Sequence, residues 1–313
     1  MTKPFGCGLA VILTMFASPL FAGQMSPDVA ARIKEIGPVI DPPKTAAIFV
    51  PLLRQEPYQG VKVERDVKYG PAERNRLDVF TPDPAASAAR PVLIFVHGGG
   101  FIAGDKHPPG SPFNDNVMLA AVKDGFVGVN MTYRLAPNSP WPAGAEDVGA
   151  TVRWVAKNIG TRGGDPARIY LMGHSAGAVH VATYVAHSEF QGPKGDLLAG
   201  AILISGLYDL TSMQVGDFER AYFGTDASTY KERSALEGLV ASKTPLLVLR
   251  AELDPSFFIQ QFDELKDRLC AALRGCVKTA VLAQHSHISE IFAMDSGDTA
   301  VSDAVLAFAK GER

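Results

Sequence analysis

The sequence predicts an α/β fold: one mainly parallel sheet of eight strands, with helices on both faces and no large separate cap. Short apolar runs of β-forming residues, such as Val92–Val96, indicate strands buried on both faces. These runs alternate with amphipathic helical segments such as Glu146–Asn158, and such alternation requires a mainly parallel sheet. The 313 residues are 47% apolar and 20% charged, a balance that suits one domain with a large core.

The expected elements follow one another with little interruption. Two early strands precede the turn-rich stretch TPDPAASAARP, and strands and helices alternate after it. The predicted strands are Val61–Tyr69, Arg76–Phe80, Val92–Val96, Phe126–Asn130, Arg168–Met172, Ala201–Ile204, Leu246–Leu249 and Lys278–Leu282. The predicted helices are Asn114–Asp124, Glu146–Asn158, Ala176–His187, Phe257–Leu273 and Thr299–Lys310.

The N-terminus divides into two segments before this domain, which covers residues 61–313. Residues 1–22 have Lys3, the apolar run Leu9–Phe16, the helix breaker Pro19 and a small residue at Ala22, the pattern of a cleaved secretory signal. A membrane anchor is the alternative, but the apolar run is short for a spanning helix. We therefore expect a secreted or periplasmic protein without stable membrane insertion. Residues 23–60 are rich in proline and predict one or two short helices over the domain.

Charge and cysteine content indicate which partners and which cellular compartment suit the protein. Thirty basic and 33 acidic residues give a net charge of −3, without the basic patch that nucleic acid or an anionic membrane surface requires. Once Cys7 is removed with the signal, Cys270 and Cys276 remain, six positions apart. An oxidising compartment would allow these two to form a disulfide, and two buried thiols are the alternative.

The strongest local motif surrounds Ser175. The sequence Gly-His-Ser-Ala-Gly, residues 173–177, stands between the strand RIYLM and the helix that begins at Ala176. A reversal this tight projects the serine hydroxyl at the carboxyl edge of the sheet, with the helix N-terminus facing any developing negative charge. The GxSxG string alone is weak because chance matches are common, but its position between strand and helix favours a nucleophile.

A second motif, His97-Gly98-Gly99-Gly100, directly follows the buried strand VLIFV. Consecutive glycines let the backbone approach a ligand closely and turn N–H groups inward. We therefore expect an oxyanion hole from the amides of Gly99, Gly100 and Ala176. A plain flexible turn is the alternative, but the two motifs, each after its own strand, support one another.

A serine nucleophile needs a base, and the base needs an acid to orient it. His285 and His287 follow the last strand, and we choose His287, with His285 second; His187 ends the helix that begins at the serine and lies too far away. Asp254, after the strand LLVL, is the preferred acid, with Asp209 as the alternative. A helix N-cap before Pro255 would also explain Asp254.

No metal or cofactor is expected. The sequence holds no HExxH, no paired CxxC and no phosphate-binding GxxxxGK[ST]. His97 is expected to brace the glycine loop, and His107, His174 and His180 have no partner at metal-ligand spacing.

Six segments in this order carry a family resemblance: HGGGFIAGDK, MTYRLAP, WPAGAEDV, NIGTRGGDPARIYLMGHSAGA, SGLYDL and ELDP. From about Val61 onward the chain resembles the hormone-sensitive-lipase-like carboxylesterases of the α/β-hydrolase fold, especially the bacterial feruloyl-esterase and kynurenine-formamidase-like branch. The resemblance implies cofactor-free hydrolysis of carboxylic esters, with Ser175, His287 and Asp254 as nucleophile, base and acid. It also implies that Tyr133–Pro137 support the oxyanion loop.

The expected function is therefore a serine carboxylesterase that hydrolyses small or aromatic esters through an acyl-enzyme. Its partner would be a small-molecule ester. An arylformamidase or another amidase would use the same three residues, so it remains open. A non-catalytic binding protein on this scaffold is less favoured because both the serine and the histidine are present.

Overall fold

The computed structural model describes residues 25–272 and 276–311, so the expected signal at 1–22 lies outside the described residues. Eight strands form one sheet in the order β1-β2-β4-β3-β5-β6-β7-β8. β1 and β2 pair antiparallel, as do β2 and β4, and all later pairs are parallel. The predicted fold class is confirmed. The strands are β1 Val61–Lys68, β2 Arg76–Pro82, β3 Arg90–Val96, β4 Val127–Met131, β5 Gly164–His174, β6 Gly200–Ile204, β7 Leu246–Leu253 and β8 Lys278–Ser286.

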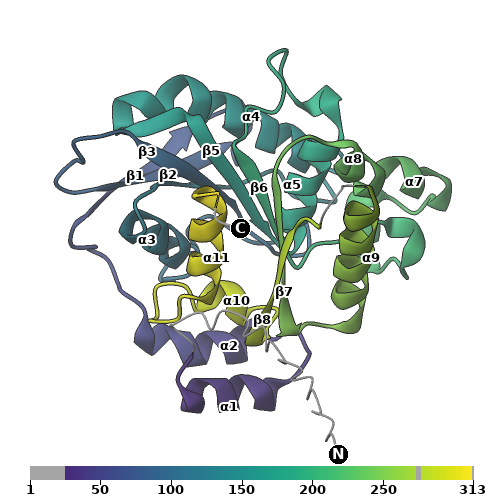
Figure 1. Ribbon diagram of the computed structural model, residues 1–313, viewed down its shortest axis with the longest axis horizontal. Helices are drawn as coiled ribbons and strands as arrows, with labels where there is room; N and C mark the ends of the chain where they lie inside the picture. The colour runs from purple at the N-terminus through teal and green to yellow at the C-terminus, as the bar shows by residue number, and fades with distance from the viewer. Residues whose placement is uncertain (1–24, 273–275, 312–313) are drawn as a thin grey trace, which may run out of the picture.

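Helices cover both faces of the sheet (Figure 1). The α-helices are α1 Pro27–Ile36, α2 Pro42–Phe49, α3 Asp115–Lys123, α4 Ala143–Asn158, α5 Ala176–Ala186, α6 Asp217–Phe223, α7 Tyr230–Arg233, α8 Leu236–Ala241, α9 Ser256–Ala272, α10 Ser289–Phe292 and α11 Ala300–Ala309. α3 and α11 bury apolar side chains on one face, and α4, α5, α8 and α9 on the other. The apolar runs read from the sequence are therefore the strands that both layers enclose.

The strand boundaries differ from the prediction mainly at the amino end of β5 and at the carboxyl ends of β7 and β8. β5 begins four residues before the predicted Arg168. β7 and β8 run four residues beyond the apolar stretches that indicated them, to Leu253 and Ser286. These added residues include exposed positions, so a search for continuous apolar runs does not find them.

Two regions outside the sheet carry more structure than the sequence indicated. In the N-terminal segment α1 and α2 bury Ile33 and Phe49 against Phe113 and Ala293 of the domain, as expected for helices packed over it. The connection from β6 to β7 holds α6, α7 and α8, which the sequence did not predict. Its Tyr222 and Phe223 pack on Phe101 beside the glycine loop, and it forms no large separate cap.

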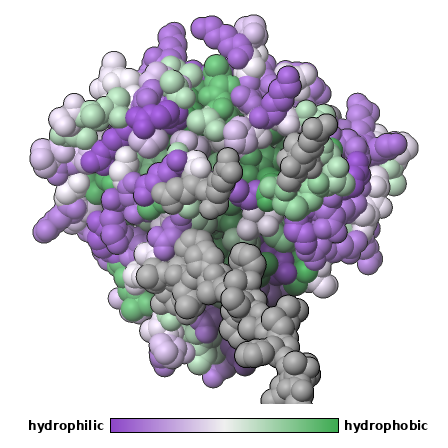
Figure 2. Space-filling model, in the orientation of Figure 1, coloured by the Kyte–Doolittle hydropathy of each residue, from purple (hydrophilic) through white to green (hydrophobic). Residues whose placement is uncertain are grey.

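The disulfide, the lengths of the helices and the surface complete the description of the fold. A disulfide joins Cys270 and Cys276, as the sequence favoured. Every helix among the described residues is too short or too polar to cross a bilayer. On the face shown in Figure 2, hydrophobic residues form separate patches between hydrophilic ones.

Candidate active site

Ser175 occupies the sharp turn between β5 and α5. Its φ is +54°, a region that side chains other than glycine rarely adopt, and its N–H is held by the Ile204 carbonyl at 2.9 Å. The turn passes so close to β3 that a Cβ on Gly177 would lie 2.0 Å from the Val96 oxygen. Only glycine fits at position 177, so the close approach of this turn to β3 requires the second glycine of GxSxG.

His287 and Asp254 complete a chain of hydrogen bonds that begins at this serine. His287 Nε2 lies 2.9 Å from Ser175 Oγ, and His287 Nδ1 lies 2.8 Å from Asp254 Oδ1. The histidine and the aspartate are each 1% exposed. Because an ionised carboxylate only accepts hydrogen bonds, the Nδ1 proton faces Asp254 and Nε2 is free to accept from the serine.

Strand pairing brings the acid and the histidine together. β7 and β8 are parallel neighbours, and Leu253 pairs with Ser286 after an irregularity in the register. The next residue of β7 is Asp254, and the next residue of β8 is His287. Phe258, on the first turn of α9, stacks on the imidazole with ring centroids 4.2 Å apart. Two hydrogen bonds and one aromatic face therefore hold the ring.

The structure places the alternative residues elsewhere. His285 Nδ1 lies 3.2 Å from Ser289 Oγ, and its Nε2 lies 3.5 Å from Asp298. Asp209 accepts the N–H and hydroxyl of Thr211 in a tight turn. His187 faces the Ser234 carbonyl at 3.3 Å. None of these three contacts Ser175.

The glycine loop lies over the serine. A Cβ on Gly98 would lie 3.1 Å from Ser175 Cβ, and Gly99 has φ +127°, where a Cβ would overlap the Ala103 carbonyl at 2.1 Å. Within the described residues, the N–H groups of Gly99 and Gly100 donate no hydrogen bond. The N–H of Ala176 is in the first turn of α5, where helices leave donors free. No acceptor among the described residues is therefore assigned to the N–H groups of Gly99 and Gly100.

Buried contacts brace this loop from below. The Tyr133 hydroxyl donates to the His97 carbonyl at 2.9 Å, and the two rings stack with centroids 4.4 Å apart. Burial lowers the pKa of His97 to about 4, so its imidazole is neutral and Nδ1 donates to the Gly98 carbonyl at 2.6 Å. Further along the loop, Lys106 is 5% exposed and pairs with Asp78 at 2.9 Å. The support expected from Tyr133–Pro137 and His97 is present.

Two exposed aromatic side chains lie near parts of the candidate site. Phe218, 55% exposed on α6, lies over Gly100: a Cβ there would be 3.2 Å from its ring. Phe257, 36% exposed, packs on Phe258 with ring centroids 4.3 Å apart, and Phe258 contacts His287. One aromatic ring thus lies at the glycine loop, and the other lies next to the ring that stacks on His287.

Three buried polar residues behind the histidine were not recognised from the sequence. Ser205 Oγ donates to Asp254 Oδ2 at 2.6 Å, and Ser205 has φ +48°. His174 Nε2 donates to the His287 carbonyl at 2.7 Å and lies 3.0 Å from Glu290 Oε1. Glu290 is 0% exposed. The signal for Glu290 was its position three residues after His287, on the helix that follows.

Among the described residues, His174, His287 and Glu290 form a group of side chains that could hold a metal ion. Donor atoms of His174, His287 and Glu290 lie within 4.8 Å of one another, so His174 does have neighbours that sequence spacing did not reveal. However, His174 Nε2 is bonded to a carbonyl, and both nitrogens of His287 are bonded to Ser175 and Asp254. A metal would have to break these bonds, so the cluster does not fit a resident ion.

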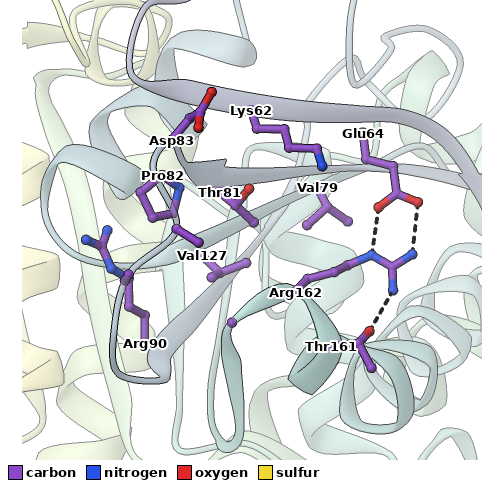
Figure 3. A pocket seen from close by; sticks show the side chains of 13 residues that line it. Lys62, Glu64, Val79, Thr81, Pro82, Asp83, Arg90, Val127, Thr161 and Arg162 are labelled. Atoms are coloured by element: carbon purple, nitrogen blue, oxygen red, sulfur yellow. Dashed lines mark hydrogen bonds and ion pairs between the residues drawn. The ribbon is translucent and has the colours of Figure 1, made fainter.

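A surface cavity of about 340 Å³ lies away from this centre (Figure 3). It opens at the amino ends of the parallel strands, and Arg162 crosses it in a bidentate pair with Glu64 at 2.7 and 2.9 Å. It contains none of the residues described above. Cavity shape therefore does not locate the site in this chain, whereas hydrogen-bond geometry does.

Comparison with known proteins identifies the family of this chain. Residues 77–269 match the family model described as BD-FAE, which covers more than half of the chain. Esterase LipQ of Mycobacterium tuberculosis is 33% identical over 210 residues, or 61% of this chain and 48% of that protein. Carboxylesterase NlhH of the same species is 33% identical over 171 residues, or 54% and 47%. The chain thus aligns with about half the length of these relatives.

A solved structure shares the fold. A bacterial heroin esterase superposes with a TM-score of 0.67 at 24% identity and covers 92% of this chain and 98% of its own. At this identity the likeness shows a common architecture, and the chemistry depends on the residues at the elbow and behind it.

Proposed function

The chain belongs to the BD-FAE family and has the α/β-hydrolase fold, and from this premise we propose that it is a serine carboxylesterase. Ser175 is the nucleophile, His287 the general base and Asp254 the acid that orients the base. One observation carries the proposal: Ser175 Oγ, His287 and Asp254 are joined by hydrogen bonds of 2.9 and 2.8 Å beneath a glycine loop with free N–H groups.

The first half of the reaction transfers the acyl group to the protein. His287 Nε2 takes the hydroxyl proton while Ser175 Oγ attacks the ester carbonyl, and Asp254 stabilises the imidazolium that forms. The amides of Gly99, Gly100 and Ala176 stabilise the oxyanion, an effect of roughly 3–4 kcal/mol for each essential donor. His287 then protonates the leaving alcohol.

The second half releases the acid. His287 takes a proton from water, the hydroxide attacks the acyl-enzyme, and a second oxyanion forms in the same place. Collapse of that intermediate returns the proton to Ser175 Oγ. No cofactor takes part in this scheme.

We propose small or aromatic carboxylic esters as substrates. Phe218 and Phe257 support this choice because aromatic side chains pack favourably on an aromatic acyl group. An arylformamidase or amidase with the same three residues is the competing function. A panel that varies acyl length and ring content, with each ester matched by its amide, separates the two by kcat/KM.

The test of the nucleophile is Ser175→Ala. Turnover of a p-nitrophenyl ester falls to background, and a fluorophosphonate no longer labels the protein, whereas Ser205→Ala keeps the label. Undiminished turnover in Ser175→Ala would exclude Ser175. A protein that binds esters without turnover and resists the fluorophosphonate would instead be a binding protein.

We also propose export to a secreted or periplasmic location. The signal-like segment 1–22 and the disulfide between Cys270 and Cys276 support it, since disulfides persist in oxidising compartments. N-terminal sequencing of the mature protein tests it: a start at residue 23 agrees, and retention of Met1 contradicts it.

A further inference from the structure

Ser205 is a second buried serine at the candidate site, and the reaction proposed above gives it no part. It directly follows Ile204, the last residue of β6, and is 2% exposed. In the sheet, β6 lies between β5, which leads to the nucleophile, and β7, which leads to the acid. Ser205 therefore stands at the carboxyl end of the one strand that separates these two groups.

The end of β6 is bonded to both neighbouring strands. The Ile204 carbonyl accepts the N–H of Ser175 at 2.9 Å, which holds the turn of the nucleophile. On the other side, the N–H of Ser205 donates to the Leu249 carbonyl of β7 at 3.0 Å. The Ser205 hydroxyl donates to Asp254 Oδ2 at 2.6 Å. Two consecutive residues of β6 and its end thus contact the turn of the nucleophile and the side chain of the acid.

The Ser205 hydroxyl completes the hydrogen bonds of the Asp254 carboxylate. Oδ1 faces His287 Nδ1 at 2.8 Å, whereas Oδ2 accepts from the Ser205 hydroxyl at 2.6 Å and from the Ala251 N–H at 3.0 Å. The oxygens of Glu290 accept no hydrogen bond from the described residues, so the single proton of Ser205 is assigned to Asp254. Hydrogen bonds to an ionised acceptor are stronger than neutral ones. With Oδ2 held on one side, the carboxylate presents Oδ1 to the imidazole.

The backbone of Ser205 is a further sign that its side chain is needed. Its φ is +48°, close to the +54° of Ser175, and residues with a side chain rarely adopt this region. Glycine would adopt it without cost. What the serine adds at this position is its hydroxymethyl group, and the one hydrogen bond of that group to the described residues is the bond to Asp254.

We propose that Ser205 is a positioning residue for the acid: its hydroxyl holds Asp254 Oδ2 and thereby keeps Oδ1 directed at His287. Ser205 acts through Asp254 and does not touch the reacting atoms. The consequence for catalysis rests on the proposed function, whereas the orientation of the carboxylate does not.

Kinetics tests the role of the hydroxyl. Ser205→Ala removes one donor to Oδ2 and leaves the Ala251 N–H, so kcat falls by about tenfold while KM stays within about twofold, the effect of one hydrogen bond to a charged group. The matched control is Ser286→Ala, beside His287. Ser286 is 1% exposed, and its hydroxyl has no hydrogen-bond partner among the described residues, so its loss leaves kcat within about twofold. Wild-type kcat in Ser205→Ala, or equal losses in the two variants, would contradict the proposal.

Ser205→Gly separates the hydroxyl from the backbone. Glycine adopts the positive φ freely, so this variant stays folded in urea unfolding, yet it loses the same hydroxyl and the same fraction of kcat as Ser205→Ala. Wild-type kcat in Ser205→Gly beside a loss in Ser205→Ala would assign the effect to the backbone and overturn the proposal. The glycine variant also decides the matter if the alanine variant fails to fold.

A double variant tests whether Ser205 acts through the acid. In an Asp254→Asn background no carboxylate remains to be oriented, so Ser205→Ala lowers kcat by less than about twofold further. A further tenfold loss in that background would show that Ser205 acts independently of Asp254, which contradicts the proposal.

Proton NMR tests the orientation of the acid without any assay of turnover. The proton between His287 Nδ1 and Asp254 gives a resonance far downfield of the amide region, and its line width reports exchange with water. Ser205→Ala broadens this resonance because the carboxylate is no longer held, whereas Ser286→Ala leaves it sharp. An unchanged resonance in Ser205→Ala would overturn the proposal. This readout remains valid if the protein hydrolyses no ester, a failure that absent fluorophosphonate labelling of the wild-type protein reports separately.

Discussion

Two pairs of fully buried carboxyl groups in this molecule are stabilised in opposite ways. Asp78 and Asp115 contact cations: Arg65 reaches Asp78 at 2.8 Å and Asp115 at 2.9 Å, and Lys106 reaches Asp78 at 2.9 Å. Asp254 and Glu290 contact only neutral donors and histidines. All four carboxyl side chains are 1% exposed or less.

The difference explains what each pair does. Arg65 and Lys106 hold the charges of Asp78 and Asp115 in one ion-pair network, in which no proton needs to move. In the proposed reaction, a cation around Asp254 and Glu290 would compete with the imidazolium of His287 for the Asp254 carboxylate, which stabilises that ion. Cations therefore compensate the first pair of buried acids, whereas hydrogen bonds compensate Asp254 and burial raises the pKa of Glu290.

The largest expected effect separates the two pairs by activity. Asp254→Asn keeps the shape but removes the charge that orients His287, so kcat falls by about 10⁴ while the protein stays folded. Asp78→Asn leaves buried cations uncompensated, so stability falls, and the folded fraction retains much more activity than Asp254→Asn. The kinetics of ester hydrolysis measures the loss of kcat, and urea unfolding measures the loss of stability. Equal losses of kcat in the two variants would contradict the assignment of Asp254 to catalysis and of Asp78 to stability.

A smaller effect is expected on stability. Lys106→Met leaves Asp78 with one cation instead of two, and the free energy of unfolding falls by about 3–5 kcal/mol, as for other broken buried ion pairs. Met preserves most of the side-chain length, so loss of charge is the main change. The matched control is Lys231→Met, at an exposed residue of α7, which should leave stability nearly unchanged. A loss under 1 kcal/mol in Lys106→Met would mean that the network stabilises little.

The last expected effect is a pH dependence of stability, and it has opposite signs in the two regions. Glu290 has a raised pKa in the fold, so its contribution is complete below its unfolded pKa and is lost as pH rises towards the folded pKa. Glu290→Gln lacks this titration, and its stability relative to wild type rises by about 1.4 kcal/mol per pH unit above about pH 4.3. Urea unfolding across pH 4–8 measures the slope, and parallel curves would contradict it.

Asp66 provides the contrast beside the cation-paired acids. The hydrogen bond from Lys106 lowers its pKa, although burial opposes the shift. Its stabilisation is present above the unfolded pKa and is lost as pH falls through the folded value, on the acid side of pH 3.8. The side chain is 58% exposed, so the effect is modest.

Most of the fold was predictable because its signals are local. Apolar runs marked the central strands such as β3, β4 and β6, since strands enclosed on both faces have few polar residues to interrupt them. The ends of β7 and β8 and the short helices α6, α7 and α8 were missed. These elements lie at an edge or on the surface, where burial is partial and packing against Phe101 and its neighbours decides their structure.

The candidate site likewise has parts that the sequence predicted and parts that it did not. The sequence by itself determined the elbow at Ser175 and the glycine loop at 97–100, because a tight turn and a close backbone approach demand glycine at particular positions. Only the tertiary structure decided between His285 and His287 and between Asp209 and Asp254, and brought Ser205 and Glu290 behind them. Those contacts join segments 49, 33 and 112 residues apart, and the pairing of β6, β7 and β8 at one edge sets them. Distances between remote segments depend on strand order and register, which local composition does not encode.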